Sequence, residues 1–384
     1  MVRKKKIAVV IPTLEGAGCE KLVAEMLPTF ANHFEVNLIM YEMYNDFSIP
    51  KGIKVLTLDS KNRSQHSFAY KTIRLLYRVF YLGLLFRKHK YDLILSFIDG
   101  CNINSFLGKT LFGVKSRLIL AEHTVNKNFF QYNKYSNKFK YIIKLLLYCA
   151  YNKSDRVVAI SSSMRNFLVN DIGVKSNKIE IIYNGINTTN FNAREEFSLD
   201  LDERFESAKI KLITVGRLVE GKNQEFLIKL MPSILDKFPD ARLFILGKGE
   251  LNNRLLNIIS KLNLSDRVFL LGWKNNVHLY LKKSDLFLFS SHYESFCNVV
   301  AESLMCGVPV ITSRYDDVVD ELIFSSTLGE AVDSNDKLLF EMQIAKYLIN
   351  KKSKQSVAEV FGNRFDFQNT CSSYVSLIQK VVNE

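Results

Sequence analysis

The sequence lacks any apolar run long enough to cross a membrane as a helix. Such a helix needs about 18 consecutive apolar residues, and no uninterrupted segment of that length occurs among the 384 residues. The apolar run near the N-terminus, residues 7–12, is short for a signal peptide and is typical of a first buried strand. We therefore expect a protein without transmembrane helices.

Cysteine pairs with metal-ligand spacing are also missing. The six cysteines stand at positions 19, 101, 149, 297, 306 and 371, and no two of them form a C-x-x-C pair. The pattern indicates reduced thiols in a cytosolic protein and argues against a zinc site. No short repeat and no low-complexity segment occurs either, which excludes a solenoid.

Acidic residues are scarce in the first half of the chain. Residues 1–190 hold 28 Lys and Arg against 13 Asp and Glu, whereas residues 191–384 hold 24 against 26. The formal charge of +13 is therefore concentrated in the N-terminal half. A one-sided charge of this size indicates an anionic partner, either nucleic acid or an anionic membrane surface.

Short apolar segments alternate with helical ones along the whole chain, which predicts βα units and parallel sheets. At 384 residues, two domains are expected. We predict an N-terminal domain over 1–190, an acidic linker over 191–209, a C-terminal domain over 210–365, and a final helix over 366–384 that packs back on the first domain. The predicted strands are 7–11, 35–41, 54–58, 93–97, 117–121, 156–160, 179–182, 211–215, 242–246, 268–270, 286–290 and 309–312.

Ligands of doubly wound domains bind beyond the carboxyl ends of the strands, so the loops there are the candidate site. In the first loop, Gly16 and Gly18 suit a phosphate at a helix start. Position 21 is lysine instead of the third glycine of G-x-G-x-x-G, which disfavours a nicotinamide cofactor. His123 follows another strand and is able to hydrogen-bond a sugar hydroxyl, although a surface loop histidine is the commoner case.

The corresponding loops of the second half carry two cations and several glycines. Gly216, Arg217 and Lys222 follow one strand, where a guanidinium fork and an ammonium suit a diphosphate. Taken alone, this loop favours the alternative of two solvated cations. Gly247 and Gly272 follow two further strands. The only tryptophan, Trp273, either borders a nucleobase or packs, and packing is the favoured interpretation.

The segment SSHYESFCNVVAESLMCGVPVITS holds two glutamates, Glu294 and Glu302, with seven residues between them. A helix is predicted from about Ser295 to Met305, ended by Gly307 and Pro309. Backbone amides of residues 296–299 would then face a phosphate, and the two carboxylates would accept hydrogen bonds from sugar or ribose hydroxyls. A nucleoside diphosphate sugar satisfies this whole set. The alternative is a helix-capping glutamate and an exposed helical one.

Two basic, aromatic-rich helical segments stand out in the N-terminal half, HSFAYKTIRLLYRVFYLGLLFRKHK and NKYSNKFKYIIKLLLYCAYNK. Each combines an apolar band with cations, a pattern that is typical of helices in a membrane interface. The alternative is that both helices pack on the sheet, and part of each is expected to do so. The candidate membrane and acceptor residues are Lys71, Arg74, Arg78, Lys88, Lys138 and Lys140.

These motifs together resemble the retaining GT-B glycosyltransferases of glycosyltransferase family 4. The resemblance covers nearly the whole chain and is carried by the E-x-seven-E signature from Glu294 to Glu302, by VGRLVEGKNQEFLIKL and by IEIIYNGINTTNF. It implies two Rossmann-like domains facing across a cleft. The glycine loop departs from the family pattern at Ala17, and Asp316 and Asp317 stand where a glycine pair is usual.

The resemblance also implies roles for single residues. Arg217 and Lys222 would bind the diphosphate, Glu302 the ribose, and Glu294 the donor sugar, while His123 would lie near the transferred sugar. The implied catalytic set is Glu294, His123, Arg217 and Lys222. The implied donor-binding set is Gly18, Gly216, Arg217, Lys222, Gly247, Gly272, Trp273, Glu294, Phe296, Cys297, Asn298, Val299 and Glu302.

The family mechanism needs no metal, because cations and a helix end stabilise the leaving diphosphate. The pair Asp200 and Asp202 resembles a metal-binding D-x-D but lies in the acidic linker, so it is not taken as a metal site. We expect transfer of a hexose or N-acetylhexosamine from a UDP-sugar to a polyprenyl-diphosphate-linked or lipid-core glycan. The protein would act peripherally on the cytoplasmic face of the membrane and bind no nucleic acid.

Two other functions are alternatives to this one. Another GT-B enzyme on sugar nucleotides, such as an epimerase or a phosphorylase, would not need the membrane-like helices. A phosphorylase would also need a lysine site for pyridoxal phosphate, which the sequence does not reveal. A non-enzymatic basic module for nucleic acid is disfavoured, because no such binding motif occurs and the aromatic residues accompany helices.

Overall fold

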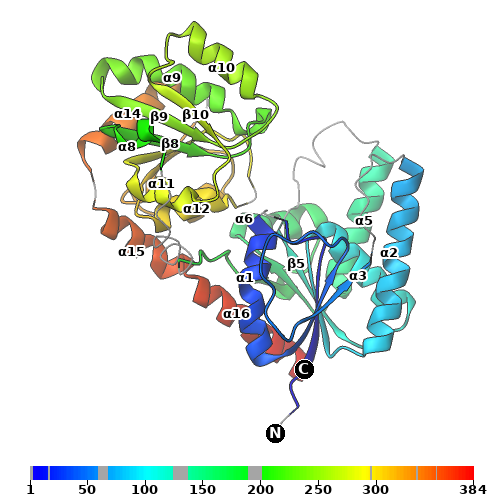
Figure 1. Ribbon diagram of the computed structural model, residues 1–384. Coiled ribbons are helices and arrows are strands. Elements are labelled where there is room, and N and C mark those ends of the chain that lie inside the picture. Colours follow the sequence, from blue (N-terminus) through cyan, green and yellow to red (C-terminus); the bar gives the residue numbers. More distant parts are fainter. Residues whose placement is uncertain are drawn as a thin grey trace. The chain divides into compact units, whose positions relative to one another are not determined.

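The computed structural model describes residues 3–15, 18–58, 68–123, 137–188, 201–294, 296–333, 336–351 and 353–384, without the side chains of 68–73 and 137–139. The described chain forms two compact units (Figure 1). Unit 1 comprises Met1–Gly185 and Gln368–Glu384, and unit 2 comprises Ile186–Phe367. The two junctions fall between Gly185 and Ile186 and between Phe367 and Gln368.

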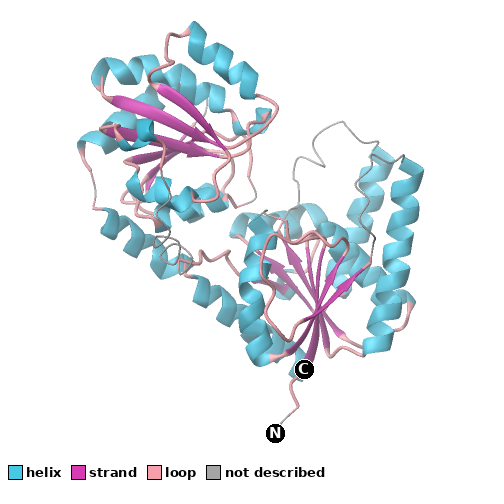
Figure 2. Cartoon of the chain, in the orientation of Figure 1, coloured by secondary structure: helices cyan, strands magenta, loops and turns pink. Residues whose placement is uncertain are grey.

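Unit 1 is built on a seven-stranded parallel sheet in the order β3-β2-β1-β4-β5-β6-β7. Its central strands are buried along almost their whole length, as expected when helices cover both faces of a parallel sheet (Figure 2). The strands are β1 (Lys6–Ile11), β2 (Glu35–Met40), β3 (Lys54–Thr57), β4 (Leu93–Phe97), β5 (Arg117–Glu122), β6 (Arg156–Ala159) and β7 (Ile179–Ile181).

Helices follow the strands of unit 1 in alternation, as the sequence pattern predicts. They are α1 (Gly18–His33), α2 (Phe68–His89), α3 (Asp99–Leu111), α5 (Asn137–Lys153), α6 (Ser162–Phe167), the π-helical turn η1 (Leu168–Ile172), the 3-10 turn η2 (Ser176–Lys178) and α16 (Phe367–Asn383). Both α2 and α5 pack against α3.

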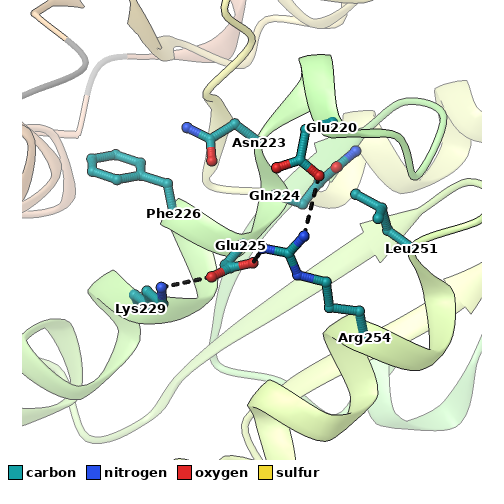
Figure 3. A pocket seen from close by; sticks show the side chains of 8 residues that line it. All are labelled: Glu220, Asn223, Gln224, Glu225, Phe226, Lys229, Leu251 and Arg254. Carbon is teal, nitrogen blue, oxygen red and sulfur yellow. Dashed lines mark hydrogen bonds and ion pairs between the residues drawn. The ribbon is translucent and has the colours of Figure 1, made fainter.

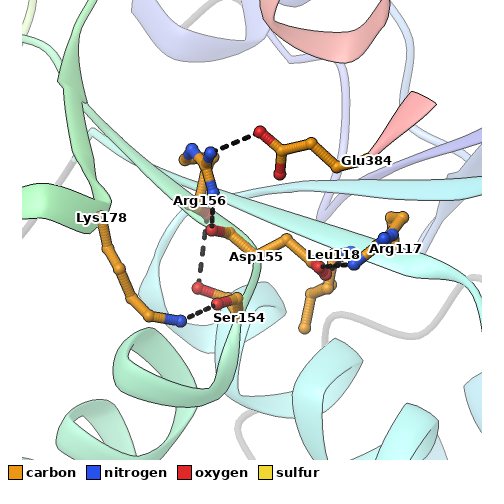
Figure 4. Close-up of polar contacts among 7 residues, drawn as sticks. All are labelled: Arg117, Leu118, Ser154, Asp155, Arg156, Lys178 and Glu384. Atoms are coloured by element: carbon orange, nitrogen blue, oxygen red, sulfur yellow. Dashed lines mark hydrogen bonds and ion pairs between the residues drawn. The ribbon is translucent and has the colours of Figure 1, made fainter. Parts of the chain in front are cut away.

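The C-terminal helix α16 belongs to unit 1 although it follows unit 2 in sequence. Its Tyr374 is buried between Phe30 of α1 and Phe97 of β4, with ring centroids 6.3 and 5.9 Å apart. At its end, Glu384 accepts a 2.6 Å hydrogen bond from Arg156 at the start of β6 (Figure 4). Aromatic burial therefore supplies most of the stabilisation, since exposed ion pairs contribute about 1 kcal/mol or less.

Asp155 links β5 and β6 at the same end of the sheet (Figure 4). One carboxylate oxygen accepts from the Arg117 guanidinium and the other from the backbone N–H of Leu118, each at 2.8 Å. Nearby, the Lys178 ammonium donates to the backbone oxygen of Ser154, which directly precedes Asp155, at 2.6 Å.

Unit 2 repeats the architecture with a six-stranded parallel sheet in the order β10-β9-β8-β11-β12-β13. Its strands are β8 (Ile210–Val215), β9 (Ala241–Leu246), β10 (Val268–Gly272), β11 (Leu286–Phe289), β12 (Val310–Ser313) and β13 (Gly329–Val332). Strand β13 was not predicted, because GEAV holds only two strongly apolar residues and begins with glycine.

Helices again separate the strands of unit 2. They are α8 (Glu203–Glu206), the 3-10 turn η3 (Glu220–Lys222), α9 (Gln224–Lys237), α10 (Asn252–Lys261), α11 (Val277–Lys283), α12 (Asn298–Met305), α13 (Val318–Leu322), α14 (Lys337–Ile349) and α15 (Lys354–Phe365). Of the described residues, no helix has both the length and the apolar character that crossing a bilayer requires.

The described part of the predicted linker, residues 201–209, is a structured piece of unit 2. Phe205 of α8 is fully buried between the rings of Phe244 and Tyr280, each with its centroid 4.8 Å away. Asp202 caps α8 by accepting from the Arg204 backbone N–H at 3.0 Å, and it also pairs with the Arg204 guanidinium. These residues therefore include a short helix, which unit 2 holds through its one buried side chain, Phe205.

In both sheets, the strand order reverses beside the first strand. The reversal lies between β1 and β4 in unit 1 and between β8 and β11 in unit 2. Helices cross to opposite faces at such a point, so the loops that leave the two strands diverge and leave room for a ligand. The candidate residues Arg217, Lys222 and Glu294 of unit 2 follow β8 and β11.

Candidate active site

Three glycine turns lie side by side at the carboxyl edge of unit 2. Gly216 donates its N–H to the Leu246 oxygen at 2.9 Å, and Gly247 donates to the Gly272 oxygen at 2.8 Å. Gly247 has φ +143°, and a Cβ there would lie 1.9 Å from the Gly216 oxygen. Only glycine fits that position, so the loops after β8 and β9 are held against each other.

Lys222 and Glu294 form an ion pair within this edge. Lys222 ends the η3 turn after β8, and Glu294 lies in the loop after β11. The Lys222 ammonium donates to Glu294 Oε1 and lies 5.4 Å from the centroid of the Phe289 ring. Both side chains are largely buried. Two residues of the predicted catalytic set, 72 positions apart in sequence, are thus in direct contact.

Three serine hydroxyls join the loops that carry this pair. Ser291 Oγ lies 3.0 Å from Glu294 Oε1 and 3.0 Å from the Gly221 oxygen. Ser290 Oγ lies 2.8 Å from the Asn223 oxygen and 3.1 Å from the Lys222 oxygen. Ser313, at the end of β12, donates to the Ser291 oxygen at 2.6 Å. Sequence reasoning assigned no role to these serines, although each follows or ends a strand at the candidate edge.

The helix between the two glutamates begins later than predicted. Helix α12 starts at Asn298, because Cys297 has φ 69° and ψ 71°, a left-handed conformation that an α-helix does not contain. Phe296 is buried against Phe365, so its side chain packs in the core. Glu302 is half-buried and lies one turn inside the helix instead of two. Val299 is the second residue of α12.

The buried side chains of Tyr315 and Cys297 lie near Glu294. The Tyr315 ring packs edge-on against Phe289, with centroids 6.0 Å apart. Burial, with the Glu294 carboxylate nearby, raises the pKa of the Cys297 thiol and that of the Tyr315 hydroxyl. Both groups are therefore neutral at pH 7, and the thiol is not poised as a nucleophile.

Two other predicted donor-site residues are exposed. Arg217 follows Gly216, and its guanidinium makes no hydrogen bond or ion pair with any described residue. Trp273 is 64% exposed. This exposure argues against the favoured interpretation that Trp273 packs; the residue follows Gly272, which ends β10 with a φ of 71°.

A pocket of about 230 Å³ lies beside η3, between the starts of α9 and α10 (Figure 3). Its charges neutralise one another: Arg254 pairs with Glu220 at 3.2 Å and with Glu225 at 2.7 Å, and Lys229 pairs with Glu225 at 2.6 Å. None of the predicted catalytic residues lines it. We do not assign the donor to this pocket.

His123 follows β5 at the carboxyl edge of unit 1. It is 5% exposed, packs against Phe97 at 5.5 Å between centroids, and its two ring nitrogens have no hydrogen-bond partner among the described residues. Burial lowers the pKa of His123 to about 3, so the imidazole is neutral at pH 7. The surface-loop interpretation is therefore wrong. The preceding Glu122 is buried too and accepts a hydrogen bond from the Tyr151 hydroxyl.

The glycine loop is only partly described, whereas the turn that carries Asp316 and Asp317 is described throughout. Gly18 is the first residue of α1, whereas Gly16 and Ala17 lie outside the described residues. Asp317 precedes α13 and donates its backbone N–H to the Asp316 carboxylate at 2.6 Å. The two aspartates thus occupy the turn that leads from β12 to α13.

The predicted membrane cations differ in exposure and in their ion pairs. Arg74 and Arg78 of α2 both contact Glu42, at 2.7 and 3.4 Å, and Lys140 of α5 is buried. The prediction that Lys140 is an exposed surface cation is wrong. Lys88 is exposed near the end of α2. Lys71 and Lys138 belong to α2 and α5, but their side chains are outside the described set.

Exposed apolar side chains are the more prominent feature of these helices. The predicted apolar band of α2 is divided, because Val79 and Leu82 face the core while Leu76, at 64% exposed, faces solvent. The α2–α5 patch comprises Leu75, Leu76, Tyr77, Phe80 and Leu84 of α2 and Tyr141, Ile142, Leu145 and Tyr148 of α5.

The sequence matches two family descriptions that together cover most of the chain. Residues 17–190 match Glycosyltransferase Family 4, and residues 200–360 match Glycosyl transferases group 1. The first match falls on unit 1 and the second on unit 2.

Curated relatives span the same length. The chain is 30% identical over 339 residues, 88% of each sequence, to N-acetylgalactosamine-N,N'-diacetylbacillosaminyl-diphospho-undecaprenol 4-alpha-N-acetylgalactosaminyltransferase of Campylobacter jejuni. It is 30% identical to UDP-Gal:alpha-D-GlcNAc-diphosphoundecaprenol alpha-1,3-galactosyltransferase of Escherichia coli, covering 81% of this chain and 80% of that one.

Solved structures share the fold at low identity. Sucrose-phosphate synthase from Thermosynechococcus elongatus has a TM-score of 0.78 and 17% identity, covering 98% of this chain and 99% of that one. HepE from Anabaena, solved in complex with UDP and glucose, has a TM-score of 0.73 and 15% identity, covering 98% and 100%. With two parallel α/β units and these relatives, the chain belongs to glycosyltransferase family 4 and is a glycosyltransferase with the GT-B fold.

Proposed function

We propose that this glycosyltransferase transfers a hexose or N-acetylhexosamine from a UDP-sugar to an undecaprenyl-diphosphate-linked glycan, with retention of the anomeric configuration. The observation that carries the proposal is the contact between Lys222 and Glu294 at the switch point between β8 and β11. It brings a cation for phosphate and a carboxylate for sugar hydroxyls within one side-chain length of each other.

The reaction breaks the bond between the anomeric carbon and the diphosphate oxygen and forms a bond from that carbon to the acceptor oxygen. The acceptor proton passes to the leaving phosphate, so the products are the extended glycan and UDP. Lys222 and the exposed Arg217 stabilise the charge that develops on the leaving group. Glu294 orients the sugar, and no step in this scheme calls for a metal ion.

The choice of substrates rests on the relatives. Names of two relatives with 30% identity specify undecaprenol diphosphate acceptors, and one of those names specifies a UDP-linked donor. The HepE complexes contain UDP or UDP-glucose on the same fold. UDP-sugars are therefore the first donors to test, and short undecaprenyl-diphosphate glycans are the first acceptors.

The α2–α5 patch supports action at a membrane surface, on the cytoplasmic face where nucleotide sugars are found. It exposes aromatic and aliphatic side chains, while the nearby Arg74 and Arg78 are already engaged by Glu42. Insertion of apolar groups would then provide more of the binding free energy than attraction to anionic lipid. Binding to vesicles should fall only modestly as salt rises, in contrast to a purely electrostatic interaction.

A panel of UDP-sugars with and without an undecaprenyl-diphosphate-linked glycan tests the proposal. Mass spectrometry of the lipid fraction should show one added sugar with one donor, and UDP release should depend on the acceptor. Absence of a glycosylated lipid product with every donor and acceptor would refute it. UDP release without acceptor dependence would indicate hydrolysis instead of transfer.

A further inference from the structure

The carboxylate of Glu294 forms an ion pair with the ammonium group of Lys222 in this structure. Its Oε1 accepts from Lys222 Nζ and lies 3.0 Å from Ser291 Oγ, and its side chain is only 16% exposed. A largely buried carboxylate with two donors on one oxygen is well held, because charge-assisted hydrogen bonds are about twice as strong as neutral ones. Under the proposed function, however, Lys222 binds the donor diphosphate.

These two roles compete for the same ammonium group. We propose that Glu294 is an internal competitor of the donor diphosphate, held on Lys222 with the help of Ser291, and that donor binding exchanges the carboxylate for a phosphate. The exchange releases Glu294 toward the sugar that arrives with the diphosphate. This inference rests on the proposed function and adds a positioning role for Ser291.

Ser291 is suited to such an exchange because its hydroxyl has one proton and three acceptors within reach. Besides Glu294 Oε1 at 3.0 Å, these are the backbone oxygens of Gly221 at 3.0 Å and Tyr293 at 3.1 Å. When the carboxylate leaves, the hydroxyl turns to a carbonyl and stays satisfied. These alternative acceptors matter because Ser291 is buried, and a buried hydroxyl left without any acceptor would be costly.

Hydrogen bonds tie the backbone of residues 221–223 to that of residues 290–292, so rotation of the two side chains is the simplest route for the exchange. Ser313 holds the Ser291 oxygen at 2.6 Å, Ser290 lies within reach of the Lys222 and Asn223 oxygens, and the His292 N–H donates to the Gly221 oxygen at 2.9 Å. The loops after β8 and β11 are thereby tied together, while the ammonium and the carboxylate remain the movable groups.

Titration of UDP into the full-length protein by calorimetry tests the exchange. Glu294→Gln keeps the shape but removes the charge, so UDP should bind about 3- to 10-fold more tightly than to the wild type. Ser291→Ala should tighten binding in the same direction by a smaller factor. Ser290→Ala is the matched control: it removes a neighbouring buried hydroxyl that does not touch Glu294, so the UDP affinity should not rise.

A double substitution separates competition for Lys222 from simple repulsion between Glu294 and the phosphates. In the Lys222→Ala background, the further change Glu294→Gln should give less than a twofold gain, because no ammonium is left to compete for. An equal gain in both backgrounds would overturn the exchange in favour of repulsion.

The direction of the effect also separates a positioning role from damage. A disturbed site binds UDP more weakly, so weaker or unchanged binding by Glu294→Gln overturns the inference even if the wild type binds UDP well. ADP and GDP are titrated in parallel. If the wild type binds none of the three nucleotides, the proposed function fails and the exchange falls with it.

Discussion

Gly247→Ala should destabilise unit 2 because its new methyl group would collide with backbone. The Cβ would lie 1.9 Å from the Gly216 oxygen and 2.9 Å from its carbonyl carbon, and the position has φ +143°. A carbon and an oxygen normally approach to about 3.3 Å. The backbone must therefore move by more than 1 Å, and no flexible side chain is available to absorb the movement.

The cost has two parts. Forcing a side chain into this region of φ costs about 1–3 kcal/mol, and overpacking costs about 1–3 kcal/mol or more. Because the neighbour is a backbone carbonyl, we expect the upper end, about 4–6 kcal/mol. That lowers the Tm of a unit of this size by about 10 °C or more. Differential scanning calorimetry of the whole protein measures the shift.

Gly272→Ala is the matched control. Gly272 also has a positive φ, +71°, but a Cβ there meets no atom within 4 Å. Gly272→Ala should lower the free energy of unfolding only by the strain of a left-handed backbone conformation, about 1–2 kcal/mol. If Gly247→Ala lowers the Tm no more than Gly272→Ala does, the steric argument is wrong.

Three further predictions concern the site and the membrane. Lys222→Ala should lower kcat/KM about 100-fold or more. Lys229, whose ammonium pairs with Glu225 at the neighbouring pocket, is the control, and Lys229→Ala should change kcat/KM by no more than about twofold. Similar losses for both variants in steady-state assays would contradict the role assigned to Lys222. Burial holds the pKa of His123 in the folded protein below its usual value of 6.5. Below pH 6.5 the unfolded chain therefore binds more protons than the folded protein does. The free energy of unfolding should fall by up to about 1.4 kcal/mol per pH unit as pH drops toward 4.5. Urea unfolding of His123→Gln should show a flatter dependence over that range, and an equally steep one would mean that other groups cause it. Replacing Leu76 and Phe80 together by serine should weaken vesicle flotation about tenfold or more. The Tm should fall only slightly, through the lost contact of Phe80 with Phe112, and unchanged flotation would exclude the α2–α5 patch as the contact.

Most of the fold was predictable because its signal is local. Strand 93–97 was predicted with its observed ends, and the other predicted strands agree with the observed ones within two residues at each end. Buried parallel strands are short apolar runs, so they can be found without knowing their neighbours. Strand β13 was missed for the same reason, since its sequence carries little of that signal and its pairing with β12 defines it.

Errors arose where a neighbour in space overrules the local pattern. The segment 201–209 looks like a connector, but Phe205 is buried by rings that lie 39 and 75 positions further along the chain. Lys140 looks like a surface cation, but it is buried. The start of α12 depended on one torsion angle at Cys297, which residue type alone does not reveal.

The sequence by itself determined the family, the two parallel-sheet units and the two glutamates with their cations, because periodicity and the E-x-seven-E spacing are written along one chain. Only the tertiary structure decided that Lys222 is bonded to Glu294, that Ser291 supports the pair, and that His123 is buried and neutral. Those properties depend on distances between residues far apart in sequence. The fold sets such distances when it brings the ends of β8 and β11 together.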